Sequence, residues 1–298
     1  MNELIEFFSN QDVKYKRNVK LSDLSTIGIG GIAKIIASPN TREKLIKTVE
    51  YLTDNNIRYK ILGRMSNVLP CDFETETVIV STLDYNKYHF EDNYVFTQSG
   101  ALFSKIINSA AKLSLGGAES LYCIPGTAGA MLSINAGAFG SQISDFLSDV
   151  EIYDVNSREA LTFKKDELAF FYRNSEIKKQ GFLILNIRFK FIEGQREEIY
   201  QGLNNIRKKR AMTQPIGERT LGSVFLKSDE YSASYLIDRC GLKGVAIGDI
   251  CVSEKHAGFF VNRKNGTAND FLALVDYVKK RVYAQYGVML KEEFEILN

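Results

Sequence analysis

The sequence predicts a protein of the α+β class, and three patterns along its 298 residues support this. Residues 33–63 give a short apolar run, a helical repeat and a second extended apolar run, which is the order of a β-α-β unit. Residues 182–191 alternate between apolar and polar side chains, as in a strand with one buried face. Residues 267–287 carry a capping pattern, a long amphipathic repeat and a terminal glycine, which together indicate a helix.

The remaining elements follow in order along the chain. A short amphipathic helix near the amino terminus places Ile5 and Phe8 on one face. After the β-α-β unit, apolar runs predict strands at 78–80 and 94–98, and a helical repeat follows at 102–113. Further strands are expected at 150–155 and 182–191, and a helix begins near Ser234. The polar segment 194–210 is the best candidate for a domain boundary, so the middle third reads as α+β with an antiparallel component.

Composition limits the classes of partner. Lys and Arg number 38 and Asp and Glu number 36, so a formal net charge of +2 gives no reason to expect nucleic acid or a membrane surface. The basic run 207–210 is interpreted as a solvated helix end. No signal peptide and no run of about 18 apolar residues is present, so we expect a cytoplasmic protein. No metal site is expected, because histidines are few and the cysteines are scattered: Cys71, Cys123, Cys240 and Cys251.

The stretch 124–140, IPGTAGAMLSINAGAFG, is unusually poor in side-chain bulk. Its interleaved glycines and alanines would let a large ligand lie directly against main-chain amides, which suits a phosphate-bearing cofactor without a Walker lysine. The alternative is a glycine-rich turn between two sheets. The candidate cofactor-binding residues here are Ile124, Pro125, Gly126, Thr127, Gly129, Asn135, Ala136 and Gly137.

This stretch resembles the flavin-binding signature of UDP-N-acetylenolpyruvoylglucosamine reductases, the enzymes that complete UDP-N-acetylmuramate for bacterial cell-wall synthesis. The chain resembles the shorter form of this family. The resemblance implies an FAD-binding fold of the p-cresol methylhydroxylase/vanillyl-alcohol oxidase type. It implies two α+β FAD-binding subdomains over residues 1–82 and 83–196. A carboxyl-terminal α+β substrate domain would cover 197–298, with its tail returning to the active site.

Two further segments match the family's cofactor loops. Gly63, Ser66 and Asn67 match the loop that holds the FAD pyrophosphate, whereas Arg64 and Met65 stand where the family has glycines. If the backbone there needs positive φ, a Cβ would hinder the approach of a phosphate. We hypothesise that φ stays negative, so that the Arg64 guanidinium pairs with a phosphate oxygen. The turn Ser99-Gly100 matches a flavin contact of the family.

Three motifs resemble the family's catalytic and substrate-binding positions. Tyr172-Arg173-Asn174-Ser175 with Lys178 implies that Arg173 holds the substrate carboxylate, although a surface ion pair is the alternative. Gly222-Ser223-Val224-Phe225 implies that Ser223 is the general acid, although a turn serine is the alternative. After Lys227 the chain continues as Ser228-Asp229, which departs from the family's Lys-Asn-Pro.

The last motif lies near the carboxyl end. The sequence Leu290-Lys291-Glu292-Glu293-Phe294 implies that Glu293 is the catalytic carboxylate, against the alternative of solvated tail charges. A shift of one residue would nominate Glu292, which in a strand points to the opposite face. His256 lies in a stretch similar to the family's Ser-x-Lys-His-Ala segment and is read as scaffold of the substrate domain.

The implied activity is the NADPH-dependent reduction of UDP-N-acetylglucosamine enolpyruvate through non-covalent FAD. The substrate contacts would be Tyr172, Lys178, Gly222, Lys227 and His256. A small UDP-sugar substrate is implied, and no nucleic-acid or membrane partner is expected. The sequence leaves the oligomeric state open, and a monomer is favoured. Two alternatives stay open, namely a non-catalytic relative that has lost flavin and an FAD oxidoreductase of the same fold with another substrate.

Overall fold

The computed structural model describes residues 1–179, 181–228 and 230–298, so Asp229 lies outside the described residues. The chain folds into two compact units. Unit 1 comprises Met1–Arg17, Ile35–Gly63 and Thr77–Arg207, and unit 2 comprises Asn18–Lys34, Arg64–Glu76 and Lys208–Asn298. Each unit is built from segments that alternate along the chain. The sequence instead predicts three consecutive domains, and the division into three stays a prediction.

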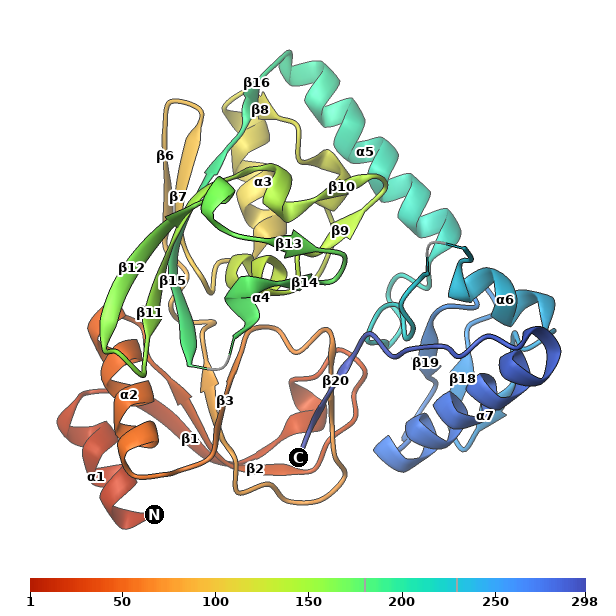
Figure 1. Cartoon of the computed structure of the whole chain (residues 1–298), viewed down its shortest axis with the longest axis horizontal. Helices are drawn as coiled ribbons and strands as arrows, with labels where there is room; N and C mark the ends of the chain where they lie inside the picture. Colours follow the sequence, from red (N-terminus) through yellow and green to blue (C-terminus); the bar gives the residue numbers. More distant parts are fainter. Residues whose placement is uncertain (180, 229) are drawn as a thin grey trace. The chain divides into compact units, whose positions relative to one another are not determined.

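The predicted β-α-β unit is present at the start of the chain (Figure 1). A four-stranded sheet has the order β1-β2-β5-β3, in which β5 pairs in parallel with both β2 and β3. The strand expected at 78–80 therefore lies between the two strands of the β-α-β unit. The elements are α1 (Asn2–Asn10), β1 (Lys14–Lys20), β2 (Ile32–Ser38), α2 (Arg42–Asp54), β3 (Tyr59–Leu62) and β5 (Val78–Ser81).

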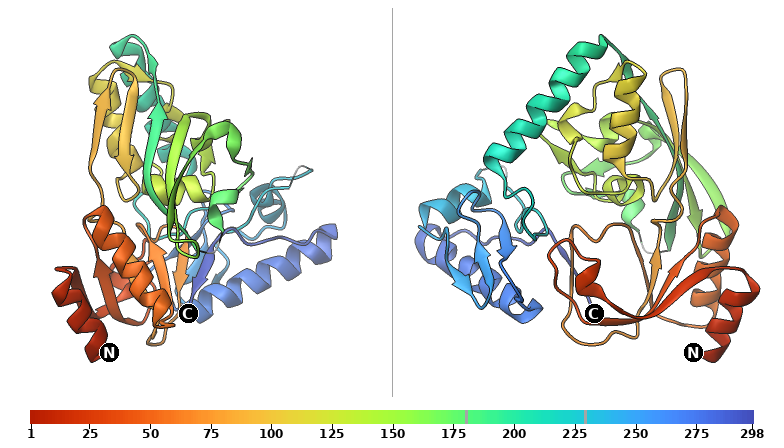
Figure 2. Two further views of the ribbon diagram at one scale, coloured as in Figure 1. Left: turned by 60° about the vertical axis from the view of Figure 1, so that its left-hand side comes forward. Right: turned by 180° about the vertical axis from the view of Figure 1, so that it is seen from behind.

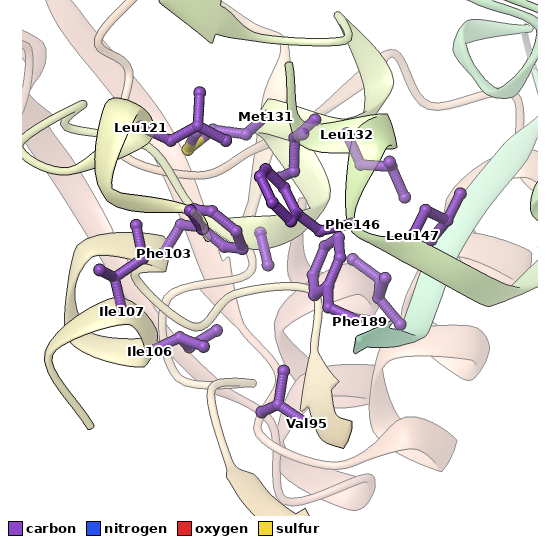
Figure 3. Packing of buried hydrophobic residues seen from close by; sticks show 14 of the residues in the cluster. Val95, Phe103, Ile106, Ile107, Leu121, Met131, Leu132, Phe146, Leu147 and Phe189 are labelled. Atoms are coloured by element: carbon purple, nitrogen blue, oxygen red, sulfur yellow. The ribbon is translucent and has the colours of Figure 1, made fainter. Parts of the chain in front are cut away.

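A five-stranded antiparallel sheet forms the second part of unit 1, with the order β12-β11-β15-β7-β6. Helix α3 and the short helix α4 contribute to its core, which Figure 3 shows around Phe103, Phe146 and Phe189. The elements are β6 (Tyr88–Glu91), β7 (Tyr94–Gln98), α3 (Phe103–Lys112), α4 (Ala128–Ser133), β11 (Leu147–Asp154), β12 (Glu159–Lys164) and β15 (Phe182–Lys190).

The central strand β15 joins the two hydrophobic cores of unit 1. The predicted alternation is confirmed, because Leu183, Leu185, Ile187 and Phe189 are buried while their neighbours are less so. Leu183 and Leu185 belong to the core under the parallel sheet, and Ile187 and Phe189 belong to the core under α3. One face of one strand thus holds both parts of the unit together.

Short elements complete unit 1 and carry the chain into unit 2. Paired two-residue strands are β8 (Leu115–Gly116) with β16 (Ile192–Glu193), β9 (Gly137–Ala138) with β10 (Ser141–Gln142), and β13 (Phe170–Phe171) with β14 (Asn174–Ser175). Helix α5 (Arg196–Thr213) occupies the segment expected to be a boundary, and the division between the units falls within it at Arg207.

Unit 2 has its own core under a three-stranded antiparallel sheet of order β17-β18-β19. Helix α7 lies over one face of this sheet, as Figure 1 and the right-hand view of Figure 2 show from opposite sides. A separate parallel pair joins β4 to β20 near the end of the chain. The elements are β4 (Val68–Pro70), α6 (Ala233–Arg239), β17 (Ala246–Ile247), β18 (Ile250–Val252), β19 (Phe260–Asn262), α7 (Ala268–Tyr286) and β20 (Glu295–Leu297).

Both ends of α7 agree with the sequence. Thr267 and Asp270 form the predicted capping box, and Gly287 ends the helix in the left-handed region at φ 69°. Asp72 adds a second cap, because its two carboxylate oxygens accept the Ala268 and Asn269 N–H groups at 2.8 and 3.1 Å. No helix in the described part of the chain is long and apolar enough to cross a membrane.

We expect Asp72→Ala to lower the free energy of unfolding by about 1–2 kcal/mol, because two helix N–H groups lose a charged acceptor. Urea titration followed by circular dichroism measures the change. Asp276→Ala is the matched control, since within the described residues Asp276 makes an exposed pair with Lys280 on the same helix, worth less than about 0.5 kcal/mol. Equal effects of the two substitutions would contradict the capping role.

Candidate active site

The stretch 124–140 contains the short helix α4 over Ala128–Ser133 and is not an open ribbon throughout. Thr127, fully buried, is the N-cap of α4. The N–H groups of Ala128 and Gly129 donate to the carbonyls of Ala101 and Ser99, both at 2.8 Å. The expectation that these amides lie open to a ligand is therefore wrong at Ala128 and Gly129, because the neighbouring turn supplies acceptors for them.

The glycines of the predicted cofactor segments allow the loops to approach each other. A Cβ on Gly63 would lie 2.4 Å from the Thr127 hydroxyl oxygen, and a Cβ on Gly129 would lie 2.6 Å from the Ser99 Cβ. On Gly100 it would lie 1.7 Å from a backbone oxygen of Thr82. Gly63, the Ser99-Gly100 turn and the stretch 124–140, called the central stretch below, therefore form one packed cluster in unit 1.

Ser99 is the residue of this cluster that best fits an external polar group. Its hydroxyl is buried, with the residue 3% exposed, and it has no hydrogen-bond partner within the described residues. A buried hydroxyl without a partner is costly in a finished interior and is common where a ligand supplies the missing partner. The cluster therefore fits a polar cofactor at Ser99.

Arg173 is held against the central stretch by its own hairpin. The strands β13 and β14 pair Phe171 with Asn174, so Tyr172 and Arg173 form the turn, and Arg173 adopts φ 54°. Its guanidinium Nη2 donates to the carbonyl of Gly137 at 2.9 Å, and its Cζ lies 5.2 Å from the centre of the Tyr172 ring. The arginine predicted from the motif is thus fixed beside the predicted cofactor stretch.

Asn135 ties the hairpin to the central stretch. Its side-chain amide donates to the Phe171 carbonyl at 3.0 Å and to Gln142 Oε1 at 2.9 Å, and the residue is 1% exposed. The Ser175 hydroxyl donates to the Ser133 carbonyl at 2.6 Å. Both amide hydrogens of Asn135 are used inside the protein, whereas the sequence assigned this residue to the cofactor; a cofactor contact through its backbone stays a prediction.

Sequence reasoning gave no role to Ser175 or Gln142. Ser175 was visible as the last residue of the Tyr-Arg-x-Ser motif, and its short hydroxyl is a usual partner for a backbone carbonyl. The Gln142 contact had no sequence signal, because it joins side chains that meet only when β9 and β10 pair.

One expectation about residues 63–67, called the pyrophosphate loop, is overturned by the structure. Met65 adopts φ 54°, so the hypothesis that φ stays negative is wrong at this residue, although Arg64 is not among the described residues with positive φ. Met65 is buried and Arg64 is exposed, which leaves the Arg64 guanidinium accessible from solvent. The left-handed conformation costs a non-glycine residue about 1–2 kcal/mol, which burial of an apolar side chain can offset.

Ser223 lies on a segment that unit 2 fixes from both sides. Ser223 forms a bridge with Phe259, and the Val224 N–H donates to the Gly258 carbonyl at 2.9 Å. The Gly258 N–H in turn donates to His256 Nδ1 at 3.1 Å, and burial lowers the pKa of His256. A neutral imidazole can accept this hydrogen bond, so His256 supports the segment that carries Ser223. This contact agrees with the interpretation of His256 as scaffold of the substrate domain.

The carboxyl-terminal tail brings Glu293 next to residues 222–225, the segment that carries Ser223 and is called the serine segment below. The Glu293 N–H donates to the Val224 carbonyl at 2.9 Å, and the half-buried Glu293 is followed by Phe294, which packs edge-on against Phe271. Glu292 instead pairs with Lys279 at 2.6 Å on the surface of α7. This arrangement favours Glu293 over Glu292 as the functional carboxylate.

The remaining candidates stay predictions. Lys178, Lys227 and Tyr172 are exposed, and Gly222 adopts φ 83° directly before Ser223. Ser66 and Asn67 are half-buried, and Ile124 and Ala136 lie in the central stretch with Pro125 exposed and Gly126 buried. That Arg173, Ser223 and Glu293 act on one substrate also stays a prediction.

Comparison with known families agrees with this geometry. The family model described as FAD binding domain matches residues 33–159. The model described as UDP-N-acetylenolpyruvoylglucosamine reductase, C-terminal domain, matches residues 214–297. The chain is therefore an FAD-binding α+β protein with a distinct carboxyl-terminal domain, which confirms the fold class predicted from the sequence.

Relatives along the whole chain narrow the family. UDP-N-acetylenolpyruvoylglucosamine reductase of Clostridium novyi (strain NT) is 35% identical over 298 residues, covering 100% of this chain and 96% of the relative. That of Clostridioides difficile (strain 630) is 34% identical over 296 residues, covering 99% and 96%. The crystal structure of the Thermus caldophilus reductase matches with a TM-score of 0.81 at 29% identity, covering 96% of this chain and 99% of that one. The chain belongs to the UDP-N-acetylenolpyruvoylglucosamine reductase family, which confirms the resemblance of its motifs.

We expect Asn135→Asp to lower the free energy of unfolding by about 2–4 kcal/mol, because a carboxylate cannot donate to the Phe171 carbonyl. Aspartate tolerates φ 45°, so the backbone of Asn135 is preserved and the loss reports the hydrogen bonds. Urea titration of the cofactor-free protein gives the value. The control Ser133→Ala removes only a local bond to the Ala130 carbonyl and should change stability by less than about 0.5 kcal/mol. An Asn135→Asp protein as stable as that control would contradict the role of Asn135.

Proposed function

We propose that this protein is an FAD-dependent oxidoreductase, UDP-N-acetylmuramate dehydrogenase, which reduces UDP-N-acetylglucosamine enolpyruvate to UDP-N-acetylmuramate with NADPH. The reaction supplies a peptidoglycan precursor, and the proposal includes a monomer acting in the cytoplasm. Family membership over the full chain supports the reaction. The observation that carries the site is the pairing of Glu293 with the segment of Ser223, through the Glu293 N–H and the Val224 carbonyl at 2.9 Å.

The chemistry that FAD supplies when bound is hydride transfer from NADPH to the carbon–carbon double bond of the enolpyruvyl group. Residues that would hold it are Gly63, Ser99 and the central stretch in unit 1, together with Arg64, Ser66 and Asn67 of the pyrophosphate loop. Within the first cluster the unpaired Ser99 hydroxyl is a polar contact that the protein leaves available. The Arg64 side chain is exposed and can pair with a phosphate oxygen.

The protein's own groups stabilise charge and deliver a proton. Arg173 binds the substrate carboxylate with its planar fork and stabilises the enolate that develops when hydride reaches the β-carbon. Ser223 gives its hydroxyl proton to the α-carbon, and this weak acid suffices because an enolate carbon is strongly basic. Glu293 is the proposed catalytic carboxylate of this reaction. Tyr172, Lys178, Gly222 and Lys227 would contact the substrate, and His256 would hold the serine segment.

The flavin-deficient alternative is favoured by one observation, the positive φ of Met65 in the pyrophosphate loop. An oxidoreductase with another substrate would retain the cofactor cluster without needing the serine and glutamate segments to adjoin. A panel of enolpyruvyl and other unsaturated acids, followed by NADPH consumption, separates this second alternative from the proposed reaction.

We expect the freshly purified protein, or protein incubated with FAD, to be yellow and to lose its flavin absorbance when NADPH is added. The unpaired Ser99 hydroxyl and the packed loops around it provide the binding site. Absorbance spectroscopy measures both uptake and reduction, and Ser99→Ala should weaken FAD binding by roughly 5- to 30-fold, as expected for one hydrogen bond. A colourless protein that takes up no FAD would establish the flavin-deficient alternative.

Ser223→Ala should separate the two half-reactions. Reduction of the bound flavin by NADPH should remain nearly intact, whereas reoxidation by the enolpyruvyl substrate should slow by about 10²–10⁴, the usual contribution of a positioned acid. Rapid-mixing absorbance records each half-reaction separately. The backbone bridges of Ser223 with Phe259 and of Phe225 with Glu292 do not use the Ser223 side chain, so the substitution removes little else. Equal loss of both half-reactions would assign Ser223 a structural role instead.

A further inference from the structure

The chain segment that directly follows the pyrophosphate loop pairs with the carboxyl-terminal end of the chain. In unit 2, strand β4 directly follows the pyrophosphate loop and pairs in parallel with β20, with Val68 opposite Glu295 and Pro70 opposite Leu297. The Cys71 N–H continues this pairing by donating to the Leu297 carbonyl at 3.0 Å. Asn67 directly precedes the first pair of this ladder and is hydrogen-bonded to Glu293.

Asn67 makes contact with the tail on both sides of Phe294. Its side-chain Nδ2 donates to the Glu293 carbonyl at 3.0 Å, and its own carbonyl accepts the Glu295 N–H at 3.0 Å. The Glu293 N–H is already bound to the Val224 carbonyl at 2.9 Å. Both main-chain polar groups of Glu293 are therefore held, one by the serine segment and the other by the pyrophosphate loop.

The two main-chain hydrogen bonds of Glu293 determine which carboxylate of the tail faces the site, because Glu292 and Glu293 are neighbours in the sequence. In an extended segment a slip of one residue turns every side chain to the opposite face. Glu292 pairs with Lys279 at 2.6 Å on α7, so the neighbouring carboxylate already has a surface partner. A hydrogen bond to the carbonyl of Glu293 itself fixes the register at the one residue whose side-chain direction has a chemical consequence.

We infer that Asn67 is a positioning residue that orients Glu293 through the Glu293 carbonyl, and so couples the cofactor loop to the carboxylate of the active site. This inference rests on the proposed function and adds to it a role that the cofactor loop has besides binding phosphate. Because Asn67 acts through Glu293, its effect belongs to the step that uses the carboxylate and not to reduction of the flavin by NADPH.

A double-mutant cycle on the FAD-loaded protein tests the coupling. We expect Asn67→Ala to slow flavin reoxidation by the enolpyruvyl substrate by about 10- to 100-fold, a typical result of misplacing a catalytic group, and to slow this step by a larger factor than it slows reduction of the flavin by NADPH. In a Glu293→Gln background the same substitution should change reoxidation by less than about threefold. Rapid-mixing absorbance measures each rate, and fluorescence titration measures FAD affinity in parallel.

Two further variants keep the test decisive. Asn67→Asp keeps the size of the side chain but cannot donate to the Glu293 carbonyl once ionised, so it should reproduce the loss if Asn67→Ala folds poorly. Ile296→Thr is the matched control, because Ile296 is exposed on β20 and outside the site, and its rates should stay within about twofold of wild type. Hydrogen exchange at the Glu295 amide should rise in Asn67→Ala and not in Ile296→Thr.

The outcomes distinguish the two proposals. An Asn67→Ala loss that persists undiminished with Glu293→Gln, or that appears only as weaker FAD binding, overturns the positioning role while leaving the reductase intact. A wild-type protein that binds FAD and oxidises NADPH but leaves the enolpyruvyl substrate unreduced overturns the proposed function, and the positioning role falls with it.

Discussion

The hydrogen bonds between the Tyr172-Arg173 hairpin and the central glycine-alanine stretch are the constraint on which unit 1 depends for its site. An arginine on a two-residue turn has many rotamers and would be a poor electrostatic catalyst if the turn were mobile. Asn135, buried within the stretch, holds the hairpin backbone, and the Gly137 carbonyl holds the guanidinium at 2.9 Å. The same few residues therefore shape the cofactor stretch and fix the charged group, so the two cannot be altered independently.

In unit 2, main-chain hydrogen bonds hold the segments that carry Ser223 and Glu293 in place. Ser223 and Glu293 come from segments far apart in the sequence, and antiparallel pairing sets their backbones side by side. Neutral His256 accepts the Gly258 N–H, and the Gly258 carbonyl accepts the Val224 N–H, which fixes the segment that carries Ser223. Preorganisation of this kind removes the entropy of finding the geometry at each turnover.

The sequence predicts the elements with strong periodicity and the residues that belong to a motif. The alternation in β15 and the capping box of α7 follow from local rules, and the structure confirms both. The insertion of β5 between β2 and β3 does not follow, because strand order depends on long-range pairing. The glycine-rich composition predicts openings for a ligand, but at Gly63 and Gly129 the side where a Cβ would stand faces another loop of the protein. Composition cannot tell these two uses of glycine apart.

Met65 shows how a departure from a motif can be compatible with the fold. Glycine adopts positive φ without strain, whereas methionine at φ 54° carries a cost of about 1–2 kcal/mol. Burying the Met65 side chain to 6% exposure recovers a free energy of similar size. The loop also gains a fixed end, since Asn67 is bonded to the tail through side chain and backbone. A loop that is fixed at Asn67 depends less on the conformational freedom of glycine. Arg64 and Met65 can therefore replace glycines while the turn that carries Ser66 and Asn67 is retained.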